Sequence, residues 1–268
     1  MKAPFDVLGN IIIVKFTRGT KIKAKKKFAK DLLKRYNSVK TVIEKTKGFK
    51  GRLRKQETRW IAGEKTKEAI YRENGCVFRF NVDSTYFSPR LSNERKEIAG
   101  KIKKGDKVLV MFAGVGPYSL VIAKNSGASK IYSNEINQEA NKYAELNTGL
   151  NKVKDKVILL KGDIKQVANK VKHGLVINNE RVPEKFDAIV MPRPQLKEMF
   201  LRETFSLSKK GTRIYYYDFC KQDEIESIVN RIKSEAKKYK KKIKILKIKK
   251  AGEIAPYKYR IRVDFKVL

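Results

Sequence analysis

Two glycines and two acids stand at the ends of three successive apolar runs of this sequence. Gly114 and Gly116 come just after the run VLVMF, where a backbone without side chains can turn tightly and approach a ligand closely. Glu135 ends the next run, 21 residues after Gly114, where an acid can accept hydrogen bonds from both ribose hydroxyls. Asp163 ends the third run, where a carboxylate can accept a hydrogen bond from an adenine amino group. This spacing predicts a nucleoside site.

Each of these features also has a plainer explanation when it is taken alone. A glycine turn can be purely structural, and either acid can cap a helix. A dinucleotide fingerprint would have a third glycine where Ser119 stands, so a pyrophosphate site is not indicated. The combination favours a site, because the carboxyl ends of parallel strands meet at one edge of a sheet. We predict that the cofactor-binding residues are Phe112, Ala113, Gly114, Gly116, Glu135, Ile136, Asp163, Ile164 and Met191.

A fourth apolar run, in DAIVMPRPQ (187–195), ends in Pro-Arg-Pro. Proline fixes φ and has no amide donor, so Pro192 and Pro194 predict a stiff, extended exit from a buried strand. Such an exit can simply end the strand. It can also form the wall of a substrate site.

The composition is strongly basic: 64 Lys and Arg against 28 Asp and Glu give a net charge of +36. A polyanion such as RNA is the partner that this charge favours, although a lysine-rich proteome would raise the charge without any RNA. Two cysteines and one histidine predict neither a disulfide framework nor a metal site. Without a membrane-length apolar run or a signal-peptide core, we expect a cytoplasmic protein.

The order of elements divides the chain near residue 85. Residues 1–85 predict a small basic α+β domain that binds RNA, with a strand at 10–16, a helix at 25–36, and strands partly paired as hairpins around Gly63 and Gly75. Residues 86–268 alternate strand and helix, which predicts a mostly parallel sheet covered on both faces. Two consecutive strands at the end predict a terminal antiparallel hairpin. Class I S-adenosylmethionine (AdoMet) methyltransferases, a Rossmann-like α/β fold, close their seven-stranded sheet in this way.

Several stretches resemble the archaeal and eukaryotic tRNA (guanine-37-N1)-methyltransferase family. They are FDVLGNIIIV, ENGCVFRFNVDSTYFSPRLSNERKEIA, MFAGVGPYSLVIAK and APYKYRIRVDFKV, and together they cover almost the whole chain in order. The resemblance implies AdoMet as methyl donor and N1 of the guanosine 3′ to the anticodon as acceptor. It therefore implies tRNA, through its anticodon stem-loop, as the partner.

Three departures from the family pattern concern the substrate. The fourth-strand motif of the family reads Asn-Leu-Pro, of which only the final proline, Pro194, is kept. Val110 stands where the family usually has an acid. Many archaeal members also carry a further N-terminal domain, which we do not expect in this chain.

Methylation of guanine N1 requires loss of its proton and stabilisation of the negative charge that develops on O6. We predict that Arg90, in the Ser-Pro-Arg motif, meets this charge, because a guanidinium stays protonated. Pro194 is predicted to form the wall of the base pocket. Glu94 and Glu135 are the two candidates for the base. His173 lies away from every motif and is not a candidate.

Two other functions stay open at this point. The related aminocarboxypropyl transferase of wybutosine synthesis uses the same cofactor but transfers a different carbon chain; the intact Ser-Pro-Arg of residues 88–90 favours methyl transfer. A catalytically silent RNA-binding relative is the other alternative. The tricyclic wyosine precursor at the same nucleotide is a second acceptor for the methyltransferase. We expect the protein to be a monomer.

Overall fold

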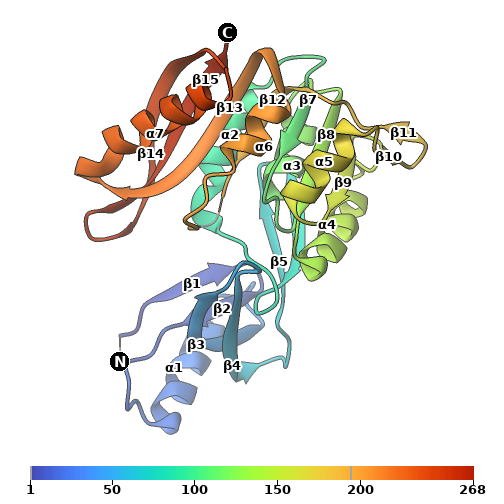
Figure 1. The fold of residues 1–268 in the computed structure, drawn as a ribbon. Helices are drawn as coiled ribbons and strands as arrows, with labels where there is room; N and C mark the ends of the chain where they lie inside the picture. Colours follow the sequence, from blue (N-terminus) through green and yellow to red (C-terminus); the bar gives the residue numbers. More distant parts are fainter. Residues whose placement is uncertain (1, 194) are drawn as a thin grey trace.

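The computed structural model describes residues 2–193 and 195–268, and Figure 1 shows two units joined by β5. The N-terminal unit contains β1 (Phe5–Leu8), β2 (Ile11–Val14), α1 (Ile22–Arg35), β3 (Thr41–Lys50) and β4 (Lys55–Gly63). The strands form one sheet in the order β1-β2-β3-β4, and α1 packs on it through Ala29 and Leu32. The expected strand and helix at the start of the chain are confirmed.

A hairpin of β5 (Glu68–Glu73) and β6 (Cys76–Asn81) follows, turning at Asn74 and Gly75, which both have positive φ. The hairpin expected around Gly63 is wrong, because β4 pairs with β3 instead. A Cβ on Gly63 would lie 2.1 Å from the carbonyl oxygen of Lys40, so this glycine permits a close backbone approach rather than a hairpin turn.

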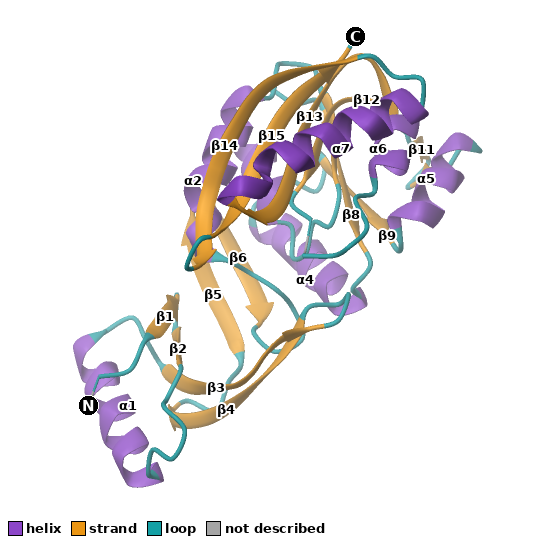
Figure 2. Cartoon of the chain, turned by 60° about the vertical axis from the view of Figure 1, so that its left-hand side comes forward, coloured by secondary structure: helices purple, strands orange, loops and turns teal. Residues whose placement is uncertain are grey.

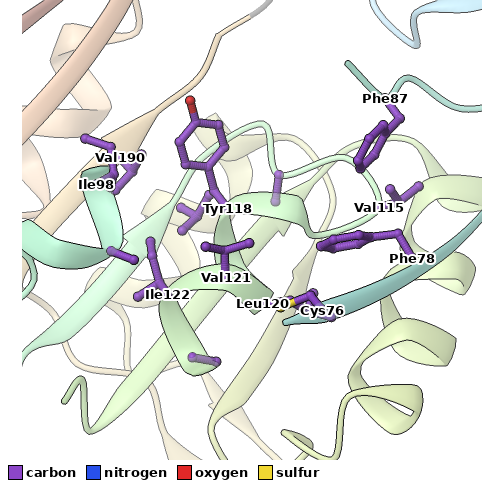
Figure 3. Close-up of a cluster of buried hydrophobic side chains, with 14 of the residues drawn as sticks. Cys76, Phe78, Phe87, Ile98, Val115, Tyr118, Leu120, Val121, Ile122 and Val190 are labelled. Atoms are coloured by element: carbon purple, nitrogen blue, oxygen red, sulfur yellow. The ribbon is translucent and has the colours of Figure 1, made fainter. Parts of the chain in front are cut away.

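The β5–β6 hairpin packs on the large C-terminal unit. Asn147 and Asn151 of α4 (Gln138–Leu150 and its C-cap) bond to the backbone of Arg79 and Val77. Figure 3 shows Cys76 and Phe78 of β6 beside side chains of the large unit such as Leu120. We infer that the division between the units falls near residues 64–67 rather than at residue 85.

The large unit contains a seven-stranded sheet in the order β14-β15-β13-β12-β7-β8-β9. Strands β13, β12, β7, β8 and β9 are parallel, and β15 is antiparallel to both β13 and β14. The expected fold class, a mostly parallel sheet closed by a terminal antiparallel hairpin, is confirmed. Its strands are β7 (Lys107–Val110), β8 (Lys130–Glu135), β9 (Val157–Lys161), β12 (Phe186–Met191), β13 (Ser208–Lys221), β14 (Ile243–Ala255) and β15 (Lys258–Val267). Its helices are η1 (Pro89–Leu91), α2 (Ser92–Lys101), α3 (Pro117–Asn125), α4, α5 (Ile164–Lys172), α6 (Leu201–Ser206), η2 (Gln222–Glu224) and α7 (Ile225–Lys238), with a small ribbon of β10 (Val176–Ile177) and β11 (Glu180–Arg181).

Alternation along the central strands gives the sheet two apolar faces. Val108 and Val110 of β7 face a core that α2 and α3 cover, whereas Leu109 faces the core under α5, α6 and α7. Figure 2 shows α7 along the β13–β15 side of the sheet and the N-terminal sheet beyond β5 and β6. Cys76 and Cys220 are both free and buried. None of the helices in the described part of the chain is long and apolar enough to cross a membrane.

Helix α6 is shorter than the helical spacing of its sequence predicts. The stretch 196–207 has helical spacing, but α6 begins only at Leu201. Phe200 has φ 55 in the left-handed region, and the carbonyls of Leu196 and Glu198 accept hydrogen bonds from the Arg193 side chain. These carbonyls are therefore unavailable to a helix that starts earlier.

Candidate active site

A cavity of about 610 Å³ lies at the carboxyl ends of β7, β8, β9 and β12, between the large sheet and the N-terminal unit. Its size falls within the range of small-molecule sites. Six of the nine predicted cofactor residues line it: Phe112, Gly114, Glu135, Ile136, Asp163 and Ile164. Ala113, Gly116 and Met191 are not among its lining residues; Ala113 and Met191 are buried beneath it, and Gly116 begins α3 with φ 89.

The glycine turn has little around the point where a side chain of Gly114 would project. Gly114 has φ 58, and the nearest atom to a Cβ built on it would be the carbonyl oxygen of Tyr86, at 3.5 Å. Phe112, two residues earlier, also has a positive φ, of 57, and its ring packs edge-on against Phe200. A Cβ on Gly116 would lie 2.4 Å from Leu120 Cδ1, the end of a flexible side chain, and the φ of 89 at this position is the feature that favours glycine. The turn therefore presents bare backbone to the cavity at Gly114.

Glu135 is fixed at the end of β8 by the backbone. Its Oε2 accepts a hydrogen bond from Gly114 N at 2.8 Å, and its Oε1 accepts one from Asn137 N at 2.7 Å. Burial raises the pKa of this carboxyl, and the amides of Asn137 and Gly114 oppose that rise. The remaining lone pairs of the carboxylate are available for ligand hydroxyls, as a ribose site requires.

Asp163 is both a helix cap and one half of an ion pair. Its Oδ1 accepts from Lys165 N at 3.0 Å, and its Oδ2 lies 2.7 Å from an Nη of Arg52, in the turn between β3 and β4. Burial tends to raise the pKa of Asp163, but the Lys165 amide and Arg52 outweigh it and lower this pKa. Arg52 was not expected from the sequence, because only the fold brings it to Asp163.

Aromatic and cationic side chains make up a second group of lining residues, which we call the aromatic half. Tyr86 packs edge-on against Phe49 with ring centroids 4.8 Å apart, and the guanidinium of Arg54 lies 5.4 Å from the Tyr86 ring centroid. Arg90 also lines the cavity; it is largely exposed and donates to Asp6 of β1 at 2.8 Å. Phe49 and Arg54 belong to no sequence motif, so the sequence alone does not identify them as residues of the site.

Glu94 is buried and does not line the cavity. Its Oε1 contacts Lys249, and its Oε2 accepts from Arg262 at 2.6 Å and from the Tyr217 hydroxyl at 3.0 Å. Tyr217 does line the cavity. Glu94 is therefore connected to the cavity through Tyr217, while Glu135 lines it directly.

The exit from β12 forms a further wall, with Pro192, Arg193, Gln195 and Leu196 among the lining residues. Pro194, predicted to shape the base pocket, lies outside the described residues. Val110 is fully buried within β7, so this departure from the family pattern changes the core rather than the cavity. His173 is the C-cap of α5 and is not among the lining residues of the cavity.

No group of three or more His, Cys, Asp or Glu side chains is placed to hold a metal ion within residues 2–193 and 195–268.

Comparison with known proteins agrees with this arrangement. The chain is 34% identical over 264 residues to tRNA (guanine(37)-N(1))-methyltransferase Trm5b of Pyrococcus abyssi, covering 98% of this chain and 74% of the relative. The crystal structure of that protein superposes with a TM-score of 0.83 at 32% identity. A second relative, tRNA (guanine(37)-N(1))/4-demethylwyosine(37)-methyltransferase Taw22 of Nanoarchaeum equitans, is 34% identical over 97% of this chain and 98% of its own length.

A solved complex of aTrm5 with tRNALeu is also similar, with a TM-score of 0.82 and 28% identity over 99% of this chain and 72% of that one. The model of the TRM5/TYW2 methyltransferase domain matches residues 69–246, which include the β5–β6 hairpin and most of the large sheet. With the cavity at the carboxyl ends of these strands, the chain belongs to the TRM5/TYW2 methyltransferase family.

Proposed function

We propose that this protein transfers a methyl group from AdoMet to N1 of the guanosine 3′ to the anticodon of tRNA. The observation that carries the proposal is one cavity lined by two unlike groups of residues. Glu135, Asp163 and Gly114, which we call the nucleoside half, offer nucleoside contacts, while Tyr86, Arg54 and Arg90 of the aromatic half offer stacking and positive charge. The names of the relatives, which specify guanosine 37, support this acceptor.

The nucleoside half fits AdoMet. Glu135, held by two backbone amides, would accept from the ribose hydroxyls, and Gly114 leaves room for close approach of the ligand. Asp163 would accept a hydrogen bond from the adenine amino group. Its Oδ2 would either accept from adenine and Arg52 together or accept from adenine in place of Arg52. AdoMet, when bound, supplies an electrophilic methyl group.

The aromatic half fits an extruded guanine base. Base–aromatic stacking contributes about 1–3 kcal/mol per base, and Tyr86 presents its ring to the cavity. A positive charge near O6 stabilises the anion that forms when N1 loses its proton. Arg90 is our candidate for this contact, and Arg54 adds a second cation on the same side.

Glu94 is our candidate for the final proton acceptor. The Tyr217 hydroxyl, which donates to Glu94 Oε2 at 3.0 Å, would accept the N1 proton as it passes its own proton to the carboxylate. The bonding pair stays on N1, which becomes the nucleophile. Burial raises the pKa of Tyr217 well above its usual value, so the phenol itself stays neutral.

The charge distribution supports a tRNA substrate. Residues 1–63 contain 19 Lys and Arg against 4 Asp and Glu, and α1 exposes a row of lysines. A net charge of this sign and density favours phosphate contacts. We propose that the protein acts on tRNA in the cytoplasm as a monomer. The similarity to Taw22 makes 4-demethylwyosine at position 37 a second candidate acceptor.

Mass spectrometry of nucleosides tests the function directly. Unmodified tRNA would be incubated with the protein and AdoMet, then digested; N1-methylguanosine is the expected product, and tRNA with adenosine at position 37 is the control. An aminocarboxypropyl nucleoside would indicate the related transferase. Unchanged nucleosides with retained tRNA binding would indicate a silent RNA-binding protein. Either result would overturn the proposal.

A further inference from the structure

Arg193 is a buried cation in the loop that leaves β12, at the position between the two prolines. Its side chain is 1% exposed, and its guanidinium lies 5.6 Å from the Tyr216 ring centroid. Burial of an arginine is costly unless its donors are satisfied; here both terminal nitrogens have partners, while Nε has none among the described residues. The hydrogen-bond partners of the guanidinium therefore show which segments the buried Arg193 holds together.

Those partners lie on two different segments. Nη1 donates to Asp218 Oδ1 on β13, while Nη2 donates to the carbonyl oxygens of Leu196 and, at 2.7 Å, Glu198. One planar group thus joins the loop to a strand of the central sheet. The guanidinium carries its donors in a fixed, planar fork, so Arg193 can make these contacts at the same time. A lysine ammonium would make the same set of contacts poorly.

Asp218 is itself held firmly. Its Oδ2 accepts from the Tyr216 hydroxyl at 2.8 Å, and its Oδ1 also accepts from Phe219 N at 2.8 Å. β13 lies between β12 and β15 in the sheet, so this acid is a fixed anchor. The hydrogen bonds from Tyr216 and Arg193 to Asp218 therefore fix the carbonyls of the loop relative to the sheet.

The loop needs such an anchor because its sequence is poor in backbone donors. Pro192 and Pro194 have no amide hydrogen, and α6 begins only at Leu201. A surface ion pair between Lys165 and Glu198 also reaches the loop, but both side chains are about half exposed, and such pairs contribute little. The buried arginine supplies the strong contacts.

The anchored loop forms part of the cavity wall, because Gln195 and Leu196 line the cavity beside Pro192. We propose that Arg193, held by Asp218, is a positioning residue that sets this wall for the target base. The proposal rests on the proposed function for the identity of the base, but the tether itself can be measured without activity. Misplacing a nucleophile by about 1 Å can reduce a rate roughly 100-fold, so a loosened wall should be visible in the rate.

The test compares Arg193→Met, Asp218→Leu and the double variant carrying both changes. Either single change leaves a buried charge unpaired and should lower Tm by roughly 5 °C or more. The double variant removes both charges and should recover most of this loss. Its single-turnover methylation rate should nevertheless stay at least about tenfold below the wild type, with AdoMet affinity unchanged within about twofold.

A matched control lies on the same strand. Arg213 of β13 pairs with Asp106 and donates to the carbonyl oxygen of Lys101 at 2.9 Å, and neither residue lines the cavity. The double variant Arg213→Met with Asp106→Leu should keep the wild-type rate. A wild-type rate in the Arg193→Met, Asp218→Leu double variant would overturn the proposal, because the pair would then only stabilise the fold.

Hydrogen exchange separates this inference from the proposed function. Segment 195–200 should exchange faster in the Arg193→Met, Asp218→Leu variant than in the wild type, whether or not the protein methylates tRNA. Equal exchange would show that the tether does not hold the loop. Faster exchange together with no methylation by the wild type would refute the proposed function alone.

Discussion

Arg52 and Asp163 form an ion pair of 2.7 Å across the cavity, although 111 residues separate them in the sequence. The contact places the β3–β4 turn of the N-terminal unit against the predicted adenine-binding acid. Asn137 strengthens the same junction, since its amide donates to the carbonyl oxygens of Leu53 and Ser84. The N-terminal unit therefore helps to form the nucleoside half of the site.

Removing either acid of this half should weaken AdoMet binding. We expect Glu135→Ala and Asp163→Ala each to cost roughly 1–3 kcal/mol, because each change leaves ligand donors without a partner. Arg52→Ala is the control: the pair is partly exposed and should change the affinity by less than about 1 kcal/mol. Calorimetric titration measures all three, and unchanged affinity in both acid variants would refute the assignment.

AdoMet affinity should also depend on pH through Glu135. Burial raises the pKa of this carboxyl, so it takes up a proton at a higher pH than an ordinary glutamate does. Only the ionised form can accept from both ribose hydroxyls, so affinity should be full above this raised pKa and decline as the pH falls through it. The variant Glu135→Gln should bind more weakly and lose this dependence. A wild-type affinity that stays constant through the mildly acidic range would contradict the role.

Binding of tRNA should weaken steeply as salt concentration rises. Each neutralised duplex phosphate adds about 0.9 to the slope of log affinity against log salt. Neutralising Lys26, Lys27 and Lys30, which are exposed on α1, should reduce the slope by up to about 3 if all three contact phosphates. Filter binding over a series of salt concentrations measures it. A flat wild-type slope would mean that the charge of +36 reflects a lysine-rich composition only.

The positions that the sequence predicted well are those whose local pattern determines their place. Strand periodicity predicted β7, β8 and β9, and Gly114, Glu135 and Asp163 line the cavity near the ends of these strands, while their contacts with a ligand stay predictions. Arg52, Arg54 and Phe49 were missed because tertiary packing alone brings the β3–β4 turn to the cavity.

Two local patterns were also misleading. Gly63 suggested a turn, but its missing side chain serves the approach of Lys40 O. The stretch before Leu201 suggested a helix, but Arg193 occupies carbonyls in it. In both cases a contact distant in sequence decides the local structure.

The central claim is that the nucleoside half of the cavity binds AdoMet and the aromatic half binds the target base. The variant Arg90→Ala tests this claim most directly. If Arg90 meets the charge on guanine O6, the single-turnover methylation rate should fall by on the order of 100-fold, as for a lost oxyanion donor, while AdoMet affinity hardly changes. The control is Arg181→Ala, since Arg181 forms a similarly exposed ion pair with Glu184 and does not line the cavity. A variant Arg90→Ala that loses only tRNA affinity and keeps its rate would make this arginine a phosphate contact and contradict the account.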